Sequence, residues 1–498
     1  MKYLTLCFLL IVVPLLNAQE EFPSVHQRES EFYRAHPERI DSVTLPSAGR
    51  HHTALKKGES LNGIVYGFHP YWKNGAEVNY DFSLLTHLAY FSGDVDAATG
   101  NFSSTHSWSS AAAVTKAKQN GVKVHFTITQ FTDHPLLFNS YQAKVNLIKN
   151  IVSQIALRGA DGCNVDVEGT SGFTPALADS FRKFIKALGD TLHTRGKELC
   201  VELPAVDWSS GWSVFGPAFF SYVGNSADQY FLMAYDYWWS GSSTAGPVAP
   251  LRSSQVTTSW HALRSIHTYL SKGCPPKKLI AGFPYYGLDW PTVSPAALAA
   301  ATADAESRTY SVVKNNYIDT IPLSRQFWSS TYNTRYYSYV SGGTWRQTWY
   351  DDSLSLSMKY DSIRALNIAG TGMWALGYDG SEKELWNALR RAFVTSVQEA
   401  VRAPERFELS QNYPNPFNPS TTFDFTIPVL PGGQVPRFTT LVIYDALGRV
   451  AATLVNENLE PGIHHKRMFN ASHLSSGIYF ARLTSGGLSQ MKKMMLIR

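Results

Sequence analysis

The sequence has few cysteines and no familiar metal-binding motif. Four cysteines occur in 498 residues, and Cys7 falls in an N-terminal apolar run, which leaves Cys163, Cys200 and Cys274. Three cysteines this far apart form no disulfide framework and match no zinc pattern. We expect buried thiols that are mostly free, with one bridge still open as an alternative. HExxH, EF-hand and phosphate-cradling glycine motifs are missing as well. We therefore expect neither a metal nor a cofactor.

Strong net charge and long hydrophobic runs are also scarce. The formal net charge is +5, spread over the whole chain, which gives no argument for nucleic acid as a partner. The one long apolar run, residues 3–16, follows Lys2 and precedes the small residue Ala18. It is too short for a membrane span and has the flanks of a secretory signal peptide, which we assign to residues 1–18. We expect an exported protein without a membrane span.

The rest of the chain divides by composition into a linker, an α/β region and an all-β region. Residues 19–60 are polar and turn-rich, so we expect a linker that could hold one short helix. Short β-rich runs then alternate with helical periodicity, which predicts a parallel sheet of βα units. The predicted strands are residues 63–68, 86–91, 122–128, 162–168, 198–204, 229–236, 278–286 and 368–376. Eight such units predict a (β/α)8 TIM barrel over residues 61–397.

Two further features complete the predicted organisation. The stretch from about residue 290 to residue 348 is too long for a simple βα loop, so we expect a small inserted subdomain before the eighth strand. After a linker at 398–407, residues 408–498 read as short β runs separated by turn residues, which favours a β-sandwich.

The stretch "ADGCNVDVEG", residues 160–169, carries the clearest chemical signal. Side chains alternate faces along a strand, so Asn164, Asp166 and Glu168 share one face, while Cys163 and the two valines share the other. In a barrel the valine face meets the helices and the polar face points inward. Glu168 then lies at the C-terminal end of the strand, where barrel enzymes place their chemistry.

The spacing of the two acids limits the mechanism. Asp166 and Glu168 are two residues apart on one strand, so their Cβ atoms lie roughly 6–7 Å apart and point the same way. Such neighbours do not flank a sugar ring as a double-displacement glycosidase requires. One acid can instead protonate the leaving oxygen while its neighbour assists a nucleophile that belongs to the substrate.

These residues carry a resemblance to a known family. "DGCNVDVE" resembles the DGxDxDxE signature of glycoside hydrolase family 18, the chitinase-like barrels. In the order of the family, "LMAYDY" supplies Met233, Tyr235 and Asp236, "GFPYYG" supplies Tyr286, and "MWALGYD" supplies Trp374. The likeness extends along residues 61–395.

The resemblance implies a role for each position. Glu168 would be the general acid, and Asp166 would orient the 2-acetamido group of the substrate. Tyr235 would hydrogen-bond the acetamido oxygen, and Trp374 would stack under the −1 sugar. Asn164, Met233, Asp236 and Tyr286 would complete the substrate-binding set.

Two departures bear on the substrate. Asn164 stands where the family signature has its first Asp, and "VKVHFTITQF" lacks the S-x-G-G of the family's third strand. Both shift the resemblance toward the spore-cortex and cell-wall branch. Chitin, peptidoglycan and N-glycans all remain candidate substrates. The alternative function is a non-catalytic, lectin-like carbohydrate-binding barrel or adhesin, against which the retained acid pair speaks.

The C-terminal region resembles a second known unit. "QNYPNPFNPSTTFDF", "VIYDALGR", "LSSGIYFARL" and "KKMMLIR" look like the type A sorting domain of the type IX secretion system. The resemblance implies a bacterial protein that is secreted or attached to the outer surface, with the secretion machinery as a partner. The alternative is a carbohydrate-binding sandwich.

Overall fold

The computed structural model describes residues 22–40, 55–56, 58–206, 214–253, 259–396, 407–428, 437–459 and 464–497. The predicted signal peptide lies outside the described residues, and so does almost all of the predicted linker at 398–407. The chain divides into two compact units, Met1–Val394 and Thr395–Arg498.

Eight parallel strands form the centre of the first unit, and each overlaps one of the eight predicted runs. The strands follow one another around the sheet, and β2 pairs with both β3 and β15, which closes the barrel. They are β2 (Ile64–Pro70), β3 (His87–Val95), β5 (Lys123–Gln130), β6 (Gly162–Val167), β7 (Glu198–Leu203), β8 (Gln229–Met233), β9 (Leu279–Pro284) and β15 (Gly370–Trp374). The predicted (β/α)8 barrel is confirmed.

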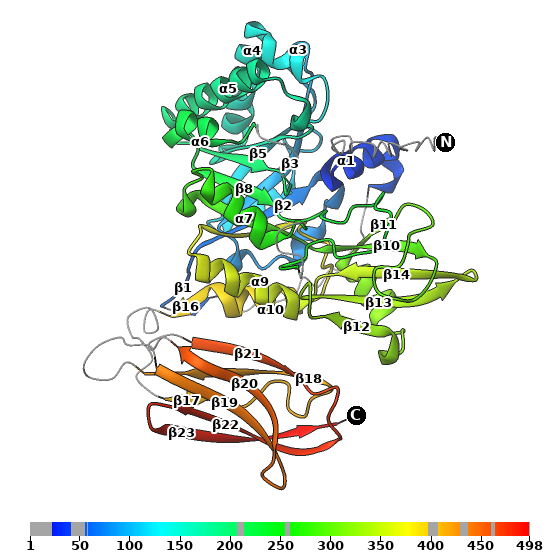
Figure 1. The fold of residues 1–498 in the computed structure, drawn as a ribbon. Helices are drawn as coiled ribbons and strands as arrows, with labels where there is room; N and C mark the ends of the chain where they lie inside the picture. Colours follow the sequence, from blue (N-terminus) through cyan, green and yellow to red (C-terminus); the bar gives the residue numbers. More distant parts are fainter. Residues whose placement is uncertain are drawn as a thin grey trace, which may run out of the picture. The chain divides into compact units, whose positions relative to one another are not determined.

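Helices surround the barrel (Figure 1). They are α2 (Ala112–Gln119), α3 (His134–Asn139), α4 (Tyr141–Arg158), α5 (Pro175–His193), α6 (Pro217–Val223), α7 (Ala262–Ser271), α9 (Ser353–Leu366) and α10 (Glu384–Phe393). The sequence explains the ends of the long helices. Thr174 caps α5 by accepting a hydrogen bond from the backbone of Leu177, and Gly159 ends α4 with a left-handed φ of 57°.

An antiparallel sheet is inserted between β9 and α9. Its order is β11-β10-β14-β13-β12, so the predicted subdomain before the last barrel strand is confirmed. The strands are β10 (Tyr286–Thr292), β11 (Glu306–Thr309), β12 (Gln326–Ser329), β13 (Thr334–Ser341) and β14 (Thr344–Tyr350), with the short helix α8 (Tyr310–Val313) among them.

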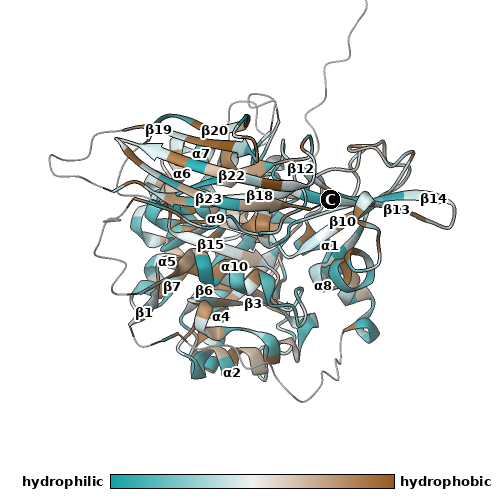
Figure 2. Cartoon of the chain, turned by 90° about the horizontal axis from the view of Figure 1, so that it is seen from below, coloured by the Kyte–Doolittle hydropathy of each residue, from teal (hydrophilic) through white to brown (hydrophobic). Residues whose placement is uncertain are grey.

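The second unit has two antiparallel sheets that enclose a core of their own. One sheet has the order β17-β18-β21 and the other β20-β19-β22-β23. The strands are β17 (Glu408–Leu409), β18 (Ser420–Thr426), β19 (Arg437–Asp445), β20 (Val450–Leu459), β21 (His464–Asn470), β22 (Gly477–Ser485) and β23 (Leu488–Leu496). Phe423 and Phe425 of β18 are buried, while Thr422 before them and Asp424 between them are partly exposed, and Figure 2 shows such colour changes along the strands.

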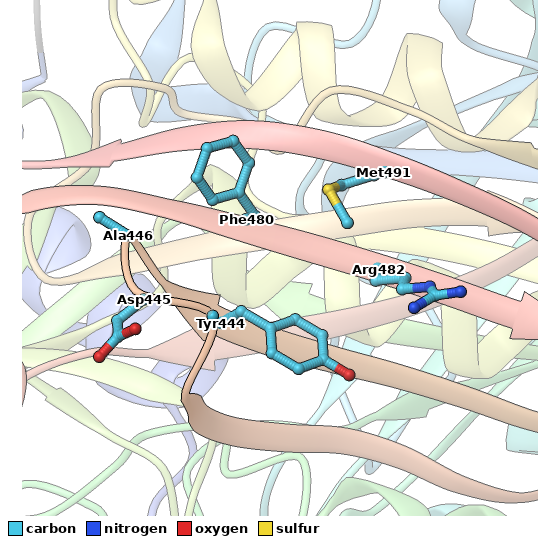
Figure 3. A pocket seen from close by; sticks show the side chains of 7 residues that line it. Tyr444, Asp445, Ala446, Phe480, Arg482 and Met491 are labelled. Atoms are coloured by element: carbon cyan, nitrogen blue, oxygen red, sulfur yellow. The ribbon is translucent and has the colours of Figure 1, made fainter.

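A pocket lies on this second unit, lined by Tyr444, Asp445, Phe480, Arg482 and neighbours (Figure 3). It contains none of the candidate site residues, all of which belong to the first unit.

The described chain begins with helix α1 (Val25–Ala35), capped by Ser24. Sequence analysis expected a linker here that could hold one short helix. Figures 1 and 2 both show α1 on the side of the barrel where the inserted sheet projects. Helix α1 contacts residues at the C-terminal ends of β3, β6, β8 and β15.

Candidate active site

Strand β6 presents its polar residues to the inside of the barrel. Asn164 and Asp166 are fully buried, and Glu168 follows the strand with a side chain 10% exposed. The register aligns Asp166 with Thr129 of β5 and Asn164 with Cys200 of β7. The sequence prediction placed the same three residues on one face, with the hydrophobic residues between them packed outward.

The strands that follow bring the other predicted residues to the same end of the barrel. Met233 ends β8, and Tyr235 and Asp236 come directly after it, with Asp236 at a left-handed φ of 56°. The Tyr286 hydroxyl donates a hydrogen bond to Asp236 Oδ1 at 2.5 Å. Trp374 ends β15 and is fully buried.

The side chain of His26, from α1, lies at the centre of these residues. Its Nδ1 is 2.9 Å from Asp166 Oδ2 and 3.6 Å from Glu168 Oε1, and its Nε2 is 2.8 Å from the Tyr235 hydroxyl. The imidazole also lies against the Trp374 indole, with ring centroids 3.7 Å apart. Asp166, Glu168, Tyr235 and Trp374 therefore converge on one point, and a ring from the same chain occupies that point.

Other residues of the α1 segment contact the surrounding groups. Ser24 Oγ donates to Glu168 Oε1 at 2.6 Å, and the backbone N–H of Val25 donates to Asp236 Oδ2 at 3.1 Å. Arg28 also reaches Asp236 Oδ2, at 3.3 Å. Each contact uses a polar group that sequence analysis had assigned to substrate.

Glu29 holds the next turn of α1 against the barrel. Trp374 Nε1 and the Tyr378 hydroxyl donate to Glu29 Oε2 at 3.0 and 2.6 Å. Burial raises the pKa of Glu29 to about 7. Helix α1 is thus hydrogen-bonded to Trp374, at the floor of the site, as well as to the acids of the site.

Burial sets the protonation of the central groups. It lowers the pKa of His26 to about 4, so the imidazole is neutral near pH 7 and offers one N–H donor and one acceptor. It raises the pKa of Asp166, and the pKa of Glu202 on β7 rises through burial and the nearby Asp166 carboxyl. The site therefore holds its acids in a poorly solvated environment, as general acid chemistry requires.

Sequence reasoning missed two parts of this site. One is Glu202, which is 1% exposed and accepts a hydrogen bond from Asn164 Nδ2 at 2.9 Å. The pattern "ELCVEL" does carry a signal, because Glu198, Cys200 and Glu202 alternate as the polar residues of β6 do. The other part is the set of α1 residues, which have no comparable periodicity.

Within the described residues, two clusters have the donor types of a metal site: His26 with Asp166 and Glu168, and His87 with His125 and Glu198. The second lies at the opposite end of the barrel, at the starts of β3, β5 and β7. There Lys123 forms an ion pair with Glu198 and supplies the positive charge that a cation would bring. This cluster is best described as an ion-pair network.

The remaining sequence expectations concern thiols and membranes. Cys163, Cys200 and Cys274 are buried and free, which confirms the expectation of buried thiols and leaves no bridge among them. Among the described helices, none combines the length and apolar character needed to span a bilayer.

The fold and the paired carboxyls at its C-terminal end define a barrel of the glycosidase type. Comparison with known families makes this specific, because residues 64–379 match the model of the glycosyl hydrolases family 18. The chain belongs to that family. Residues 411–497 match the model of the secretion system C-terminal sorting domain.

Individual relatives agree with the family. The chain is 29% identical over 280 residues to YdhD of Bacillus subtilis, by its assigned name a sporulation-specific glycosylase, a match that covers 53% of this chain and 60% of the relative. It is 26% identical over 260 residues to human di-N-acetylchitobiase, which covers 46% of this chain and 63% of that one. The chain thus spans somewhat less than two thirds of the length of these two relatives.

Solved structures show the same fold. A family 18 chitinase from Cycas revoluta, determined with (GlcNAc)3, superposes with a TM-score of 0.57 at 19% identity and covers 66% of this chain and 99% of its own.

Proposed function

We propose that the barrel is a secreted glycosidase that hydrolyses β-1,4 bonds next to an N-acetylglucosamine unit. The observation that carries the proposal is the convergence of Asp166, Glu168, Tyr235 and Trp374 on one point at the mouth of the barrel. A sugar ring at that point would have an indole on one side and acids at its edge.

The chemistry follows from this arrangement. Glu168 gives its proton to the glycosidic oxygen, and the bond from that oxygen to the anomeric carbon breaks. The acetamido carbonyl oxygen of the same sugar attacks the anomeric carbon, so that the substrate supplies the nucleophile and the configuration is retained after hydrolysis. Asp166 orients the acetamido N–H, and the Tyr235 hydroxyl donates to its carbonyl oxygen. Water then opens the cyclic intermediate and returns a proton to Glu168.

The name of the human relative, di-N-acetylchitobiase, supports this substrate class, and the name of the Bacillus subtilis relative supports action on a glycosidic bond. The match at residues 411–497 supports export from a bacterium through the type IX secretion machinery, with release or attachment at the outer surface. We assign the first 18 residues to a signal peptide in the same route.

The test is a product assay on chitin, peptidoglycan and a glycoprotein in parallel, with mass spectrometry of the released sugars. Glu168→Gln should lower kcat by a factor of at least about 10² and leave sugar binding intact, because the amide cannot donate the proton. Near wild-type turnover in Glu168→Gln would contradict the role of Glu168. Binding without new reducing ends, in a protein freed of α1, would favour the lectin-like alternative.

A further inference from the structure

We propose that residues 22–36, α1 with its cap, are an intramolecular inhibitor that must leave the barrel before a glycan can bind. This inference rests on the proposed function, because it takes the groups around His26 as the reacting centre. It concerns how access to that centre is controlled.

His26 occupies the position of a sugar ring. Its flat face lies on Trp374, and its two nitrogens reach Asp166 on one edge and Tyr235 on the other. The side chain is fully buried, so the imidazole and a sugar cannot be there together. A neutral imidazole has the one donor and one acceptor that a carboxylate and a tyrosine hydroxyl need, so both partners are satisfied.

The residues on either side of His26 occupy the remaining polar groups. Ser24 donates to one oxygen of Glu168, the proposed general acid, at 2.6 Å. Val25 and Arg28 take one oxygen of Asp236, and Glu29 takes the indole N–H of Trp374. Substrate and α1 therefore compete for the same atoms, and binding of one excludes the other.

The burial pattern and the length of the segment bear on how it is released from the barrel. Apart from His26, its fully buried residues are only Val25 and Ser30, and Phe32 is 44% exposed. An 11-residue helix is marginal in water on its own, so α1 gains little by staying folded once it is detached. Release breaks the ring contacts of Tyr33 with Trp72 and of His26 with Trp374, and these contacts, with the burial of Val25, set the hydrophobic cost of opening.

The test uses two matched double variants of the full chain. His26→Asp with Arg28→Glu places negative charge against Asp166, Glu168 and Asp236 and should expel α1. His36→Asp with Arg39→Glu makes the same two changes at exposed positions, one at the end of the segment and one three residues beyond it. With chitotetraose as substrate, kcat/KM of the first variant should rise about 10- to 100-fold if the open form is 1–10% of the wild type. The control should match the wild type.

Activity of the first variant at or below that of the wild type, with an unchanged melting curve, would overturn the proposal. As a second measurement, a synthetic peptide of residues 22–36 should inhibit the opened variant, and the same peptide with His26→Ala should not. If no form of the protein releases sugar, the proposed hydrolysis fails. Calorimetric titration with chitotetraose then decides the inhibitor question: tighter binding to the opened variant supports it, and equal binding refutes it.

A separate observation assigns a positioning role to Glu202. We infer that Glu202 and Asp166 share one proton inside the barrel and that Glu202 holds Asp166 in place through it. The register of β6 and β7 runs from Gly162 beside Glu198 to Val165 beside Val201, so one more step sets Asp166 beside Glu202. Adjacent strands are about 4.8 Å apart, so the two carboxyls are neighbours.

The unpaired atoms support this inference. Within the part of the chain that the structure describes, Asp166 Oδ1 and Glu202 Oε2 are buried without a hydrogen-bond partner, while their other oxygens bond His26 and Asn164. Two adjacent buried carboxyls do not both ionise, and a proton between them satisfies both oxygens.

Glu202→Gln should lower kcat about 10- to 100-fold with KM within about twofold, and should move the acid limb of the pH profile to lower pH. The double variant Asn164→Asp, Glu202→Gln exchanges the amide and the carboxyl across the same hydrogen bond. It should recover most of the kcat that Glu202→Gln loses. Glu198→Gln, at the other end of β7, serves as the control whose pH profile stays in place. An unchanged kcat and profile in Glu202→Gln, or a folded swap variant without recovery, would refute the shared proton.

Discussion

A buried ion pair between Lys359 and Asp351 joins helix α9 to the inserted sheet. Both side chains are at most 1% exposed, and the Lys359 ammonium lies 5.3 Å from the centre of the Phe283 ring of β9. Asp351 follows β14 and is also 3.5 Å from Thr334 Oγ1 of β13. Lys359→Met keeps the length of the apolar stem and removes the charge, so it isolates the contribution of the pair.

Two estimates bound the loss in the free energy of unfolding that is expected for Lys359→Met. Breaking a buried pair by removing one partner costs about 3–5 kcal/mol, because the other charge stays buried and uncompensated. Asp351 can avoid the cost of a buried, uncompensated charge by taking up a proton. From an ordinary pKa of 3.8, protonation at pH 7 costs about 4 kcal/mol and at pH 5 about 2 kcal/mol. We therefore expect Lys359→Met to destabilise the barrel by about 3–4 kcal/mol at pH 7 and by about 2 kcal/mol at pH 5.

The assay is urea unfolding of the full chain, with the barrel transition fitted at both pH values. Asp351→Asn in addition should return most of the loss, because no buried charge is then left alone. Lys149→Met, on the exposed face of α4, is the matched control and should change stability by less than about 0.5 kcal/mol. A loss below 1 kcal/mol, or one that does not shrink between pH 7 and pH 5, would refute the reasoning.

Three further predictions test the site and the base of the barrel. Made in the His26→Asp, Arg28→Glu background, where His26 no longer bonds Tyr235, Tyr235→Phe should lower kcat/KM on chitotetraose about 10- to 100-fold, because a donor to the acetamido oxygen is lost, and its melting temperature should stay close to that of the parent variant; unchanged kinetics would contradict this. Trp374→Phe should raise KM severalfold by shrinking the stacking face, as isothermal titration with the same sugar would show, whereas equal affinity would remove Trp374 from the subsite. At the other end of the barrel, burial raises the pKa of Glu198, but hydrogen bonds from His125, His87 and Lys123 outweigh it and hold that pKa below its usual range. Glu198 thus contributes stability above about pH 4.5 that is lost as the pH falls further, so Glu198→Gln should destabilise at pH 7 and lose less than the wild type between pH 5 and pH 3; parallel pH curves would count against this.

The barrel could be predicted from the sequence because its strands are buried on both faces. The run at residues 229–236 is nearly continuous in apolar residues, from Tyr230 to Tyr235, which is typical of parallel strands. The face of Asn164, Asp166 and Glu168 was equally readable, because polar residues at every second position of an apolar run are rare. The exact ends of the strands could not be predicted as well. Strand β8 stops at Met233, and the chain then turns through Asp236 with a positive φ that no residue pattern predicts.

Glu202 shows a limit of a different kind. Its pattern with Glu198 is visible in the sequence, yet the two acids have unrelated surroundings. Glu198 meets Lys123 and two histidines at the base of the barrel, whereas Glu202 meets Asn164 near the top. Only the register between β6 and β7 distinguishes a structural ion pair from a residue beside the candidate catalytic acid.

The α1 segment was read as a linker because its residues are mostly polar and much of the surface that it covers is polar as well. Sequence patterns find a docked helix by its apolar stripe, and such a stripe is needed only where the partner surface is apolar. The mouth of this barrel is lined by carboxyls, so the matching face of α1 carries the neutral hydrogen-bonding ring of His26 and the cations Arg28 and, further along, Arg34, which pairs with Asp94 at 3.0 Å. Complementary charge is the signal for such a contact, and it can be recognised only after the acids have been placed by the fold. The same polarity that hid the helix from sequence analysis lets water replace its hydrogen bonds on release, which is what an inhibitor that must be released requires.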